Sequence, residues 1–537
     1  MRKNFFLLLL ATLSCIYTQA QSPTVALIPY PNNITLCPKG STYRIGKKSA
    51  IKAVADVPHI AKKLQQTIER HTSLKLPIAG KGDITLSIDN NLDGTEHYTI
   101  EITKKGVKIK GATETALLRA VQTMDQIMMG DYINSSKGEI HNLVIDDKPR
   151  YEYRAIMLDP ARHFIPVKDV KFFIDQIAKY KYNILQLHLT DDQGWRVEIK
   201  SHPQLTTVGA FRNKNGGNQG PDNGYYTQEE LKDIVKYAAE QSIEVIPELD
   251  IPGHSTAILA AYPHLGCAFR SNTPKEIGST TNMMICACSE EAYSIYADIF
   301  NEIAAIFPSK RIHLGGDEAA INDNWAKCED CLALMKESGY DTPEQLMNIF
   351  FGKMLDNVRK AGKEPILWCE LDNIWPPANE YLFPYPADVT LVTWRNALTP
   401  KCIELTRKHG HQLIMAPGEH TYLDYPQYKG DLPERGNWGM PTTTLEQSYR
   451  LDPGMGLPVD EHAHITGVMG TLWAEAIRDI NRVTYMAFPR AMAIAEAGWS
   501  NMDMRSWESF KERIYPNIYD MMKRGVSVRV PFEIIER

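Results

Sequence analysis

The sequence contains no apolar run long enough to cross a membrane. A spanning helix needs about 20 consecutive apolar residues, and no run in this chain reaches that length. The run Phe5–Ala11 follows two basic residues and precedes the small-residue sequence Thr18–Ala20, a pattern typical of a secretory signal peptide. We therefore expect a signal peptide at residues 1–20 and an exported mature protein, either periplasmic or extracellular. A lipid anchor at Cys15 is the weaker alternative, because Thr12 fits poorly at the apolar position of that motif.

An excess of positive charge is also missing. The chain has 59 Lys and Arg against 65 Asp and Glu, a formal net charge of −6, and no basic stripe. Nucleic acid is therefore not an expected partner, and neither is a membrane surface bound by charge. With 43% hydrophobic and 23% charged residues, the composition is typical of a soluble globular protein. The length suggests two or three domains, or one large barrel with an accessory domain.

Cysteine is scarce and does not form a standard zinc-binding pattern. Cys286 and Cys288 are separated by one residue, and Cys328 and Cys331 by two. Structural zinc sites need four ligands, and no His-x-x-x-His sequence follows either pair. An exported protein favours disulfides or buried thiols instead. We therefore predict no metal site and no cofactor, while the disulfide connectivity cannot be read from the sequence.

Residues 21–150 predict a small α+β accessory domain. Ile84–Ile88, Tyr98–Ile102 and Val107–Ile109 alternate apolar and polar residues, as half-buried strands do. Thr113–Met129 places its apolar residues on one face and predicts a helix. The region has no paired acids, histidine cluster or glycine-rich phosphate loop, so we expect no catalytic residues in it.

From Tyr153 onward, a strand, a polar loop and a helix follow one another eight times. This alternation predicts an α/β protein, a (β/α)₈ TIM barrel that follows the accessory domain. We assign the barrel to residues 151–537, with a C-terminal helical segment. The eight apolar runs are Ala155–Leu158, Ile184–Leu189, Ile243–Leu249, Ile312–Leu314, Pro365–Trp368, Val389–Trp394, Leu413–Ala416 and Ile465–Trp473.

Residues suited to catalysis or ligand binding follow these runs, at the strand ends where such barrels carry their active sites. In the fourth repeat, Gly315 and Gly316 precede two adjacent acids, Asp317 and Glu318. Neighbouring residues of a strand point to opposite faces, so both acids can serve one pocket only if the strand has ended. The glycines allow that ending. Two carboxylates in different environments suit general acid/base catalysis.

Tryptophans also recur at the strand ends, at Trp368, Trp394 and Trp473. An indole face stacks on the C–H face of a sugar ring, and carboxylates and arginine bind sugar hydroxyls. A single tryptophan is more often part of a core. Three of them at strand ends, with acids between, favour a carbohydrate site.

Four motifs resemble those of family 20 glycoside hydrolases, the exo-acting β-N-acetylhexosaminidases. The region before the barrel also resembles the accessory domain of that family. The resemblance implies removal of terminal β-linked N-acetylhexosamine from the non-reducing end of glycans, with the substrate's own acetamido oxygen as nucleophile, an oxazoline intermediate and net retention. The family is an exception to the usual two-carboxylate scheme. The motifs are Leu158–His163, His188–Arg196, Leu249–His254 and His313–Glu318.

The resemblance also implies a role for each matching residue. Glu318 matches the general acid/base, and Asp317 matches the residue that orients the 2-acetamido group. Tyr422 matches the hydroxyl donor to the acetamido carbonyl. The remaining matches are Trp368, Trp394 and Trp473 as pocket walls and sugar platform, Arg162, Asp424 and Glu475 as ligands of the sugar hydroxyls, and Asp191 and His254 as a relay behind Glu318.

Three alternatives stay open at this point. A metal-dependent barrel hydrolase could use His188, Asp191, Asp250 and His254 as ligands, although the first strand lacks the usual His-x-His ending. A non-catalytic glycan-binding barrel would be expected to have lost one acid of the pair. A lacto-N-biosidase would release a disaccharide instead of one sugar. The sequence determines neither the preference between GlcNAc and GalNAc, nor the natural glycan, nor the oligomeric state.

Overall fold

The computed structural model describes residues 25–38, 41–53, 57–130, 138–211, 223–270, 282–373, 377–431 and 440–532. The predicted signal peptide lies outside these ranges. Within them, no helix has both the length and the apolar character needed to span a bilayer. The chain divides into two compact units. The first contains the residues up to Pro149 together with Met504–Asp520, and the second contains Arg150–Asp503 and the residues from Met521 onward.

The first unit is built on a six-stranded sheet in the order β1-β8-β5-β6-β4-β3. Strands β5 and β6 form an antiparallel hairpin in which Ile100 lies opposite Ile109. The strands are β1 (Ile34–Leu36), β3 (Ile51–Ala53), β4 (Ile84–Ile88), β5 (Tyr98–Thr103), β6 (Gly106–Gly111) and β8 (Leu143–Asp147); β2 (Thr42–Arg44) pairs with β7 (Glu139–His141), and the helices are α2 (Pro58–Thr72) and α3 (Glu114–Met129).

Helix α3 begins where the sequence predicts, because the Thr113 hydroxyl accepts a hydrogen bond from the backbone N–H of Ala116 and so caps the first turn. The last helix, α16 (Trp507–Lys523), differs from the expectation. The sequence predicts it as part of the barrel region, whereas most of its residues belong to the first unit by their contacts. The Asn517 amide donates to the carbonyl oxygen of Ala26 over 3.0 Å.

The second unit is a closed barrel of eight parallel strands in the order β10-β13-β14-β15-β16-β17-β18-β9. The prediction of a (β/α)₈ barrel after a small α+β domain is confirmed. Each strand falls within the apolar run that predicted it or within two residues of it. The strands are β9 (Tyr153–Leu158), β10 (Ile184–His188), β13 (Glu244–Glu248), β14 (Arg311–His313), β15 (Glu364–Trp368), β16 (Thr390–Thr393), β17 (Leu413–Met415) and β18 (Ile465–Leu472).

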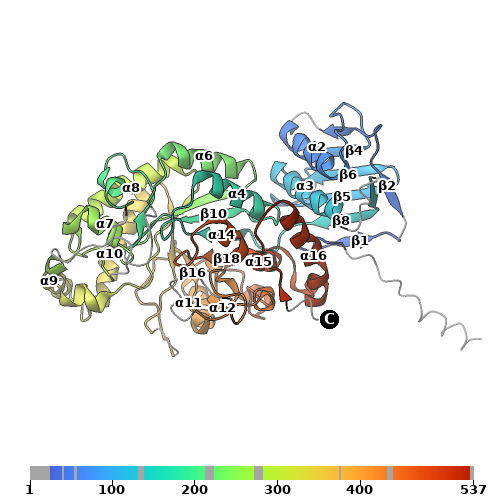
Figure 1. The fold of residues 1–537 in the computed structure, drawn as a ribbon. Coiled ribbons are helices and arrows are strands. Elements are labelled where there is room, and N and C mark those ends of the chain that lie inside the picture. The colour runs from blue at the N-terminus through green and yellow to red at the C-terminus, as the bar shows by residue number, and fades with distance from the viewer. Residues whose placement is uncertain are drawn as a thin grey trace, which may run out of the picture. The chain divides into compact units, whose positions relative to one another are not determined.

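Helices surround the barrel (Figure 1), and apolar side chains fill its interior. Met157, Ile246, Ile366 and Met469 are fully buried there. The longer helices are α4 (Val167–Ala178), α6 (Gln228–Ala239), α8 (Glu290–Ile306), α9 (Glu329–Glu337), α10 (Leu346–Lys360), α11 (Thr399–His409), α14 (Ile480–Ala487) and α15 (Arg490–Trp499); the short elements are β11 (Thr190–Asp191), β12 (Gly194–Trp195), α5 (Gln204–Thr207), α7 (Thr256–Ala261), α12 (Gly418–Thr421) and α13 (Leu445–Tyr449).

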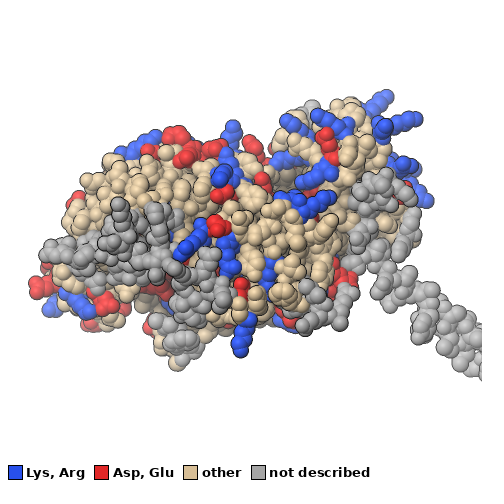
Figure 2. Space-filling model, in the orientation of Figure 1, with Lys and Arg blue, Asp and Glu red and all other residues tan. Residues whose placement is uncertain are grey.

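Charged side chains of both signs are mixed on the face of the second unit that Figure 2 shows. No continuous stripe of Lys and Arg crosses the described surface in this view.

Candidate active site

The two adjacent acids follow a sharp turn at the end of β14. Gly315 and Gly316 have φ of +65° and +97°, and Glu318 has φ of +50°. The backbone N–H of Gly316 donates to the Asp250 carboxylate over 3.1 Å. A Cβ at Gly315 would lie 1.8 Å from an oxygen of the same carboxylate. This turn gives the acids different surroundings, since the Asp317 side chain is 10% exposed and that of Glu318 is 54% exposed.

His254 lies behind the pair. Its Nδ1 is 3.2 Å from an Asp191 oxygen, and its Nε2 is 3.8 Å from Asp317 and 3.7 Å from Glu318. Burial alone would lower the pKa of His254, but the charges of Asp191 and Asp250 outweigh burial and raise it well above the usual range. The structure thus brings Asp191, His254 and Glu318 together in the order that the sequence analysis expected. Their roles in proton transfer stay predictions.

Arg162 links Asp191 to the first and last strands. Its guanidinium lies 2.8 Å from Asp191, 3.2 Å from Asp159 and 3.9 Å from Glu475. Burial would raise the pKa of Asp191, but the charges of Arg162 and His254 hold it well below its usual range. A guanidinium already bound to Asp191 repels a dication, so the proposed metal set of His188, Asp191, Asp250 and His254 is a poor fit for metal-dependent hydrolysis.

Trp368 lies one layer below the cavity. The sequence analysis placed it in the wall of the acetamido pocket, but it is not among the lining residues and is 1% exposed. Its indole N–H donates to Glu248 over 3.0 Å, and its ring packs 5.8 Å from that of Trp473. Glu248 also lies 3.1 Å from His188 and 3.2 Å from His313. Trp368 therefore packs against Trp473, which lines the cavity.

Tyr422, Asp424 and Glu475 follow strands β17 and β18. The backbone N–H of Leu423 donates to the carbonyl oxygen of Thr471 over 2.8 Å, which joins the loop after β17 to the end of β18. The buried guanidinium of Arg490 donates to the carbonyl oxygens of Leu423 and Tyr425 over 2.6 and 2.9 Å and so supports this loop from below. Burial raises the pKa of Asp424 well above its usual range and also raises the pKa of Glu475.

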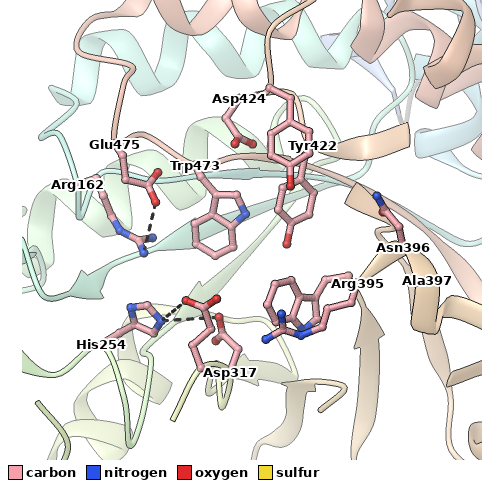
Figure 3. Close-up of a pocket in the computed structure, with 13 residues that line it drawn as sticks. Arg162, His254, Asp317, Arg395, Asn396, Ala397, Tyr422, Asp424, Trp473 and Glu475 are labelled. Carbon is pink, nitrogen blue, oxygen red and sulfur yellow. Dashed lines mark ion pairs between the residues drawn. The ribbon is translucent and has the colours of Figure 1, made fainter. Parts of the chain in front are cut away.

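These residues enclose a cavity of about 460 Å³, within the usual range for small-molecule sites. Figure 3 shows His254 and Asp317 on one side and Tyr422, Asp424 and Glu475 on the other, with Trp473 between them. Most of the predicted site residues line it, and Asp191 and Trp368 lie behind its wall. The lining residues are Arg162, His254, Asp317, Glu318, Trp394, Arg395, Asn396, Ala397, Tyr422, Asp424, Tyr425, Trp473 and Glu475.

The sequence analysis did not assign Arg395, Asn396, Ala397 or Tyr425 to the site. Their signal in the sequence is their position next to Trp394 and Asp424, directly after strand ends. Glu370 also follows a strand end but was not among the predicted site residues; it accepts a hydrogen bond from the Trp394 indole over 3.1 Å and lies 3.6 Å from Arg395. Burial raises the pKa of Glu370 to about 8, and the charges of Asp317 and Glu318 add to this effect.

A barrel whose strand-end loops place two unequal carboxylates over a cavity of indoles and acids has the architecture of a glycoside hydrolase. The model of the glycosyl hydrolase family 20 catalytic domain matches residues 151–502, and that of family 20 domain 2 matches residues 24–148. The chain therefore belongs to glycosyl hydrolase family 20, as its motifs suggested, and it is a glycoside hydrolase.

Several relatives are similar over most of the chain. A β-hexosaminidase of Akkermansia muciniphila is 39% identical over 432 residues, which cover 80% of this chain and 84% of that protein. A β-hexosaminidase of Vibrio furnissii is 31% identical, covering 88% of this chain and 76% of that protein. The family 20 exo-β-N-acetylglucosaminidase of Vibrio harveyi, solved in complex with N-acetylglucosamine, gives a TM-score of 0.83 at 29% identity and covers 95% of this chain and 79% of that one.

Proposed function

We propose that this protein is an exo-acting, retaining β-N-acetylhexosaminidase. It removes terminal β-linked GlcNAc or GalNAc from the non-reducing end of glycans. One observation carries the proposal: Asp317 and Glu318 stand side by side at the cavity, both within 4 Å of His254, and differ strongly in exposure. The β-hexosaminidases that are similar over most of the chain support it.

In the first step, Glu318 donates a proton to the glycosidic oxygen as the bond between that oxygen and C1 breaks. The acetamido carbonyl oxygen of the same sugar forms a bond to C1. Asp317 accepts a hydrogen bond from the acetamido N–H and offsets the positive charge that develops on the oxazolinium ring. In the second step, Glu318 takes a proton from water, whose oxygen attacks C1 and displaces the acetamido oxygen. Two inversions at C1 give net retention.

The other lining residues position the terminal sugar. Trp394 and Trp473 contact the acetamido group and the sugar face, and the Tyr422 hydroxyl donates to the acetamido carbonyl. Burial raises the pKa of Tyr422 well above its usual range, so this hydroxyl keeps its proton. Arg162, Asp424 and Glu475 bind the ring hydroxyls. Ligands on several sides of one terminal sugar favour release of a single sugar over a disaccharide.

Hydrolysis of p-nitrophenyl β-N-acetylglucosaminide and of the matching β-glucoside tests this proposal. The wild type should cleave only the first, because the second has no acetamido oxygen. Glu318→Gln should lower kcat by roughly 10²–10⁴, with the smaller loss on this activated leaving group. Glu404→Gln, an exposed glutamate on α11, is the matched control and should keep full activity. Equal cleavage of both substrates would exclude the substrate-assisted mechanism, and cleavage of neither would favour a disaccharide-releasing or a purely glycan-binding protein.

We also propose that the mature protein is exported, on the basis of the predicted signal peptide at residues 1–20. N-terminal sequencing of the protein from fractionated cells tests this. A mature chain that begins at Gln21 outside the cytoplasm supports export, and a chain that keeps residues 1–20 in the cytoplasm excludes it.

A further inference from the structure

Four cysteines from separate segments of the barrel unit meet in one buried cluster. Cys267 and Cys286 come from the loop after β13, and Cys328 and Cys331 from the start of α9. Their side chains are at most 6% exposed, and their sulfur atoms all lie within 4.8 Å of one another. Every cysteine among the described residues is a free thiol. The sequence predicts disulfides or buried thiols here and no metal site, because no His-x-x-x-His sequence follows either cysteine pair.

The sulfur separations match a metal site and not a disulfide. The sulfur atoms of Cys286 and Cys331 are 3.5 Å apart. A disulfide requires about 2.05 Å. Four thiolates that bind zinc tetrahedrally at about 2.3 Å lie roughly 3.8 Å from one another. A separation of 3.5 Å, with all four sulfur atoms within 4.8 Å of one another, fits ligands around one shared ion.

The local structure also favours thiolates. Cys328 is the N-cap residue of α9, and Cys331 lies in the first turn of that helix. Free backbone N–H groups and the positive end of the helix dipole stabilise negative charge there. The Cys-x-x-Cys spacing between these two residues is common in structural zinc sites.

We propose that Cys267, Cys286, Cys328 and Cys331 bind a structural zinc ion. Tetrahedral sulfur ligation of this kind is typical of zinc, and no open position is left for a substrate. Cys288 lies 3.7 Å from Cys331 and is partly exposed, so we assign it outside the ligand set.

The ion would fasten together the two loops that carry the catalytic residues. Ile285, next to Cys286, donates its N–H to Pro252 over 3.0 Å, two residues before His254. The indole of Trp325 donates to the carbonyl oxygen of Ile285 over 2.9 Å and so joins the loop after β14 to the same segment. The proposed zinc site would thus hold the loops of His254 and Glu318 at a fixed separation. It would not contact the sugar.

Metal analysis of the full-length protein, purified without chelators, tests the proposal. The wild type should contain about one zinc ion per chain, and Cys331→Ser should lose it. Cys402→Ser removes another buried cysteine of the same unit and should keep the ion. Replacement of zinc by cobalt in the folded wild type should produce thiolate-to-cobalt charge-transfer bands, a readout that does not depend on the folding of any variant.

Three results would overturn the proposal. The first is a wild type with no more zinc than Cys331→Ser and without cobalt–thiolate bands. The second is a disulfide between any two of the four cysteines, found by alkylation and peptide mapping of the purified protein. The third is retention of zinc by Cys267→Ser together with its loss from Cys288→Ser, which would remove Cys267 from the ligand set.

Discussion

The residues of this site owe their chemistry to their surroundings more than to their type. Asp317 and Glu318 are adjacent in the chain, but one side chain is nearly buried and the other is half exposed. In the proposed mechanism, one carboxylate stays against the acetamido N–H and the other exchanges protons with substrate and water, so the two need different environments. The turn at Gly315 and Gly316 provides this difference.

The Tyr422 hydroxyl offers a test of the acetamido pocket. Tyr422→Phe should lower kcat on the N-acetylglucosaminide by roughly 10²–10³, because a buried donor to a developing charge is lost. The melting temperature should change little, because the hydroxyl faces the cavity. Tyr519→Phe, which alters a side chain 69% exposed, is the control. An unchanged kcat in Tyr422→Phe would mean that another group polarises the carbonyl.

The raised pKa of Glu370 predicts that the stability of the protein depends on pH. Its pKa rises from 4.5 to about 8 on folding, so between these values the folded state holds a proton that the unfolded state has lost. The stability contributed by the neutral acid is complete below pH 4.5 and decreases as the pH rises to 8. Glu370→Gln keeps a neutral group at every pH. Relative to the wild type, its free energy of unfolding should therefore increase by about 2–4 kcal/mol between pH 4.5 and 8.

Denaturant unfolding of both proteins at several pH values measures this difference. Glu404→Gln, on the exposed surface of α11, should show no such trend. A constant difference between Glu370→Gln and the wild type across the range would contradict a raised pKa at Glu370.

At the scale of single elements, the short strand β14 and the turn after it position Asp317 and Glu318. Because β14 ends at His313, the chain is free to turn before the acids. Asp250, from the neighbouring loop, accepts the Gly316 N–H and occupies the space where a side chain at Gly315 would lie. The position of the two acids thus depends on the missing side chain of Gly315 and on the carboxylate of Asp250.

Gly315→Ala should therefore destabilise the protein and reduce activity. The added Cβ would approach Asp250 to 1.8 Å at a φ of +65°, so Asp250 or the turn must move, at a cost of roughly 1–3 kcal/mol. Gly352→Ala is the matched control, since Gly352 lies within α10 and an added Cβ meets nothing within 4 Å. It should be stabilising by about 0.5–1 kcal/mol through helix propensity. Thermal unfolding and kcat of both variants measure the contrast, and equal behaviour would contradict the role of the turn.

At the scale of the whole molecule, residues from both ends of the chain build the first unit. Arg513 and Asn517 of α16 donate to the carbonyl oxygens of Leu27 and Ala26 over 2.6 and 3.0 Å. The barrel strands lie between these segments in sequence. The first unit is therefore complete only when the C-terminal helix has been made.

Asn517→Ala tests this arrangement. The substitution leaves the buried carbonyl of Ala26 without its donor and should cost about 1–3 kcal/mol in the stability of the first unit. Hydrogen exchange should become faster in residues 25–30 and in α16. Tyr519→Ala, at an exposed position of the same helix, should leave the exchange unchanged. Faster exchange confined to the barrel strands would contradict the assignment of α16 to the first unit.

Much of the fold could be predicted from the sequence, because the local periodicity of apolar residues identifies strands and helices. Eight apolar runs of strand length separated by helical segments admit few architectures other than a parallel barrel. Once the barrel is assumed, the residues after the strands must meet at one end, so Arg162, Trp394, Asp424 and Glu475 could be grouped without coordinates. The position of His254 next to Glu318 was implied only by the resemblance to family 20, because barrel geometry does not specify which residues of neighbouring loops touch.

How deeply each side chain is buried, and which residues distant in sequence it contacts, were decided only by the tertiary structure. Trp368 and Trp473 both end strands, but only packing in the barrel put the first beneath the second. The raised pKa of Glu370 depends on burial by residues far away in sequence. The four clustered cysteines are spread over 65 positions of the sequence, from Cys267 to Cys331. No periodic pattern links them. Periodicity reports which face of an element is buried, whereas the distance between two side chains on different elements is set by how those elements pack.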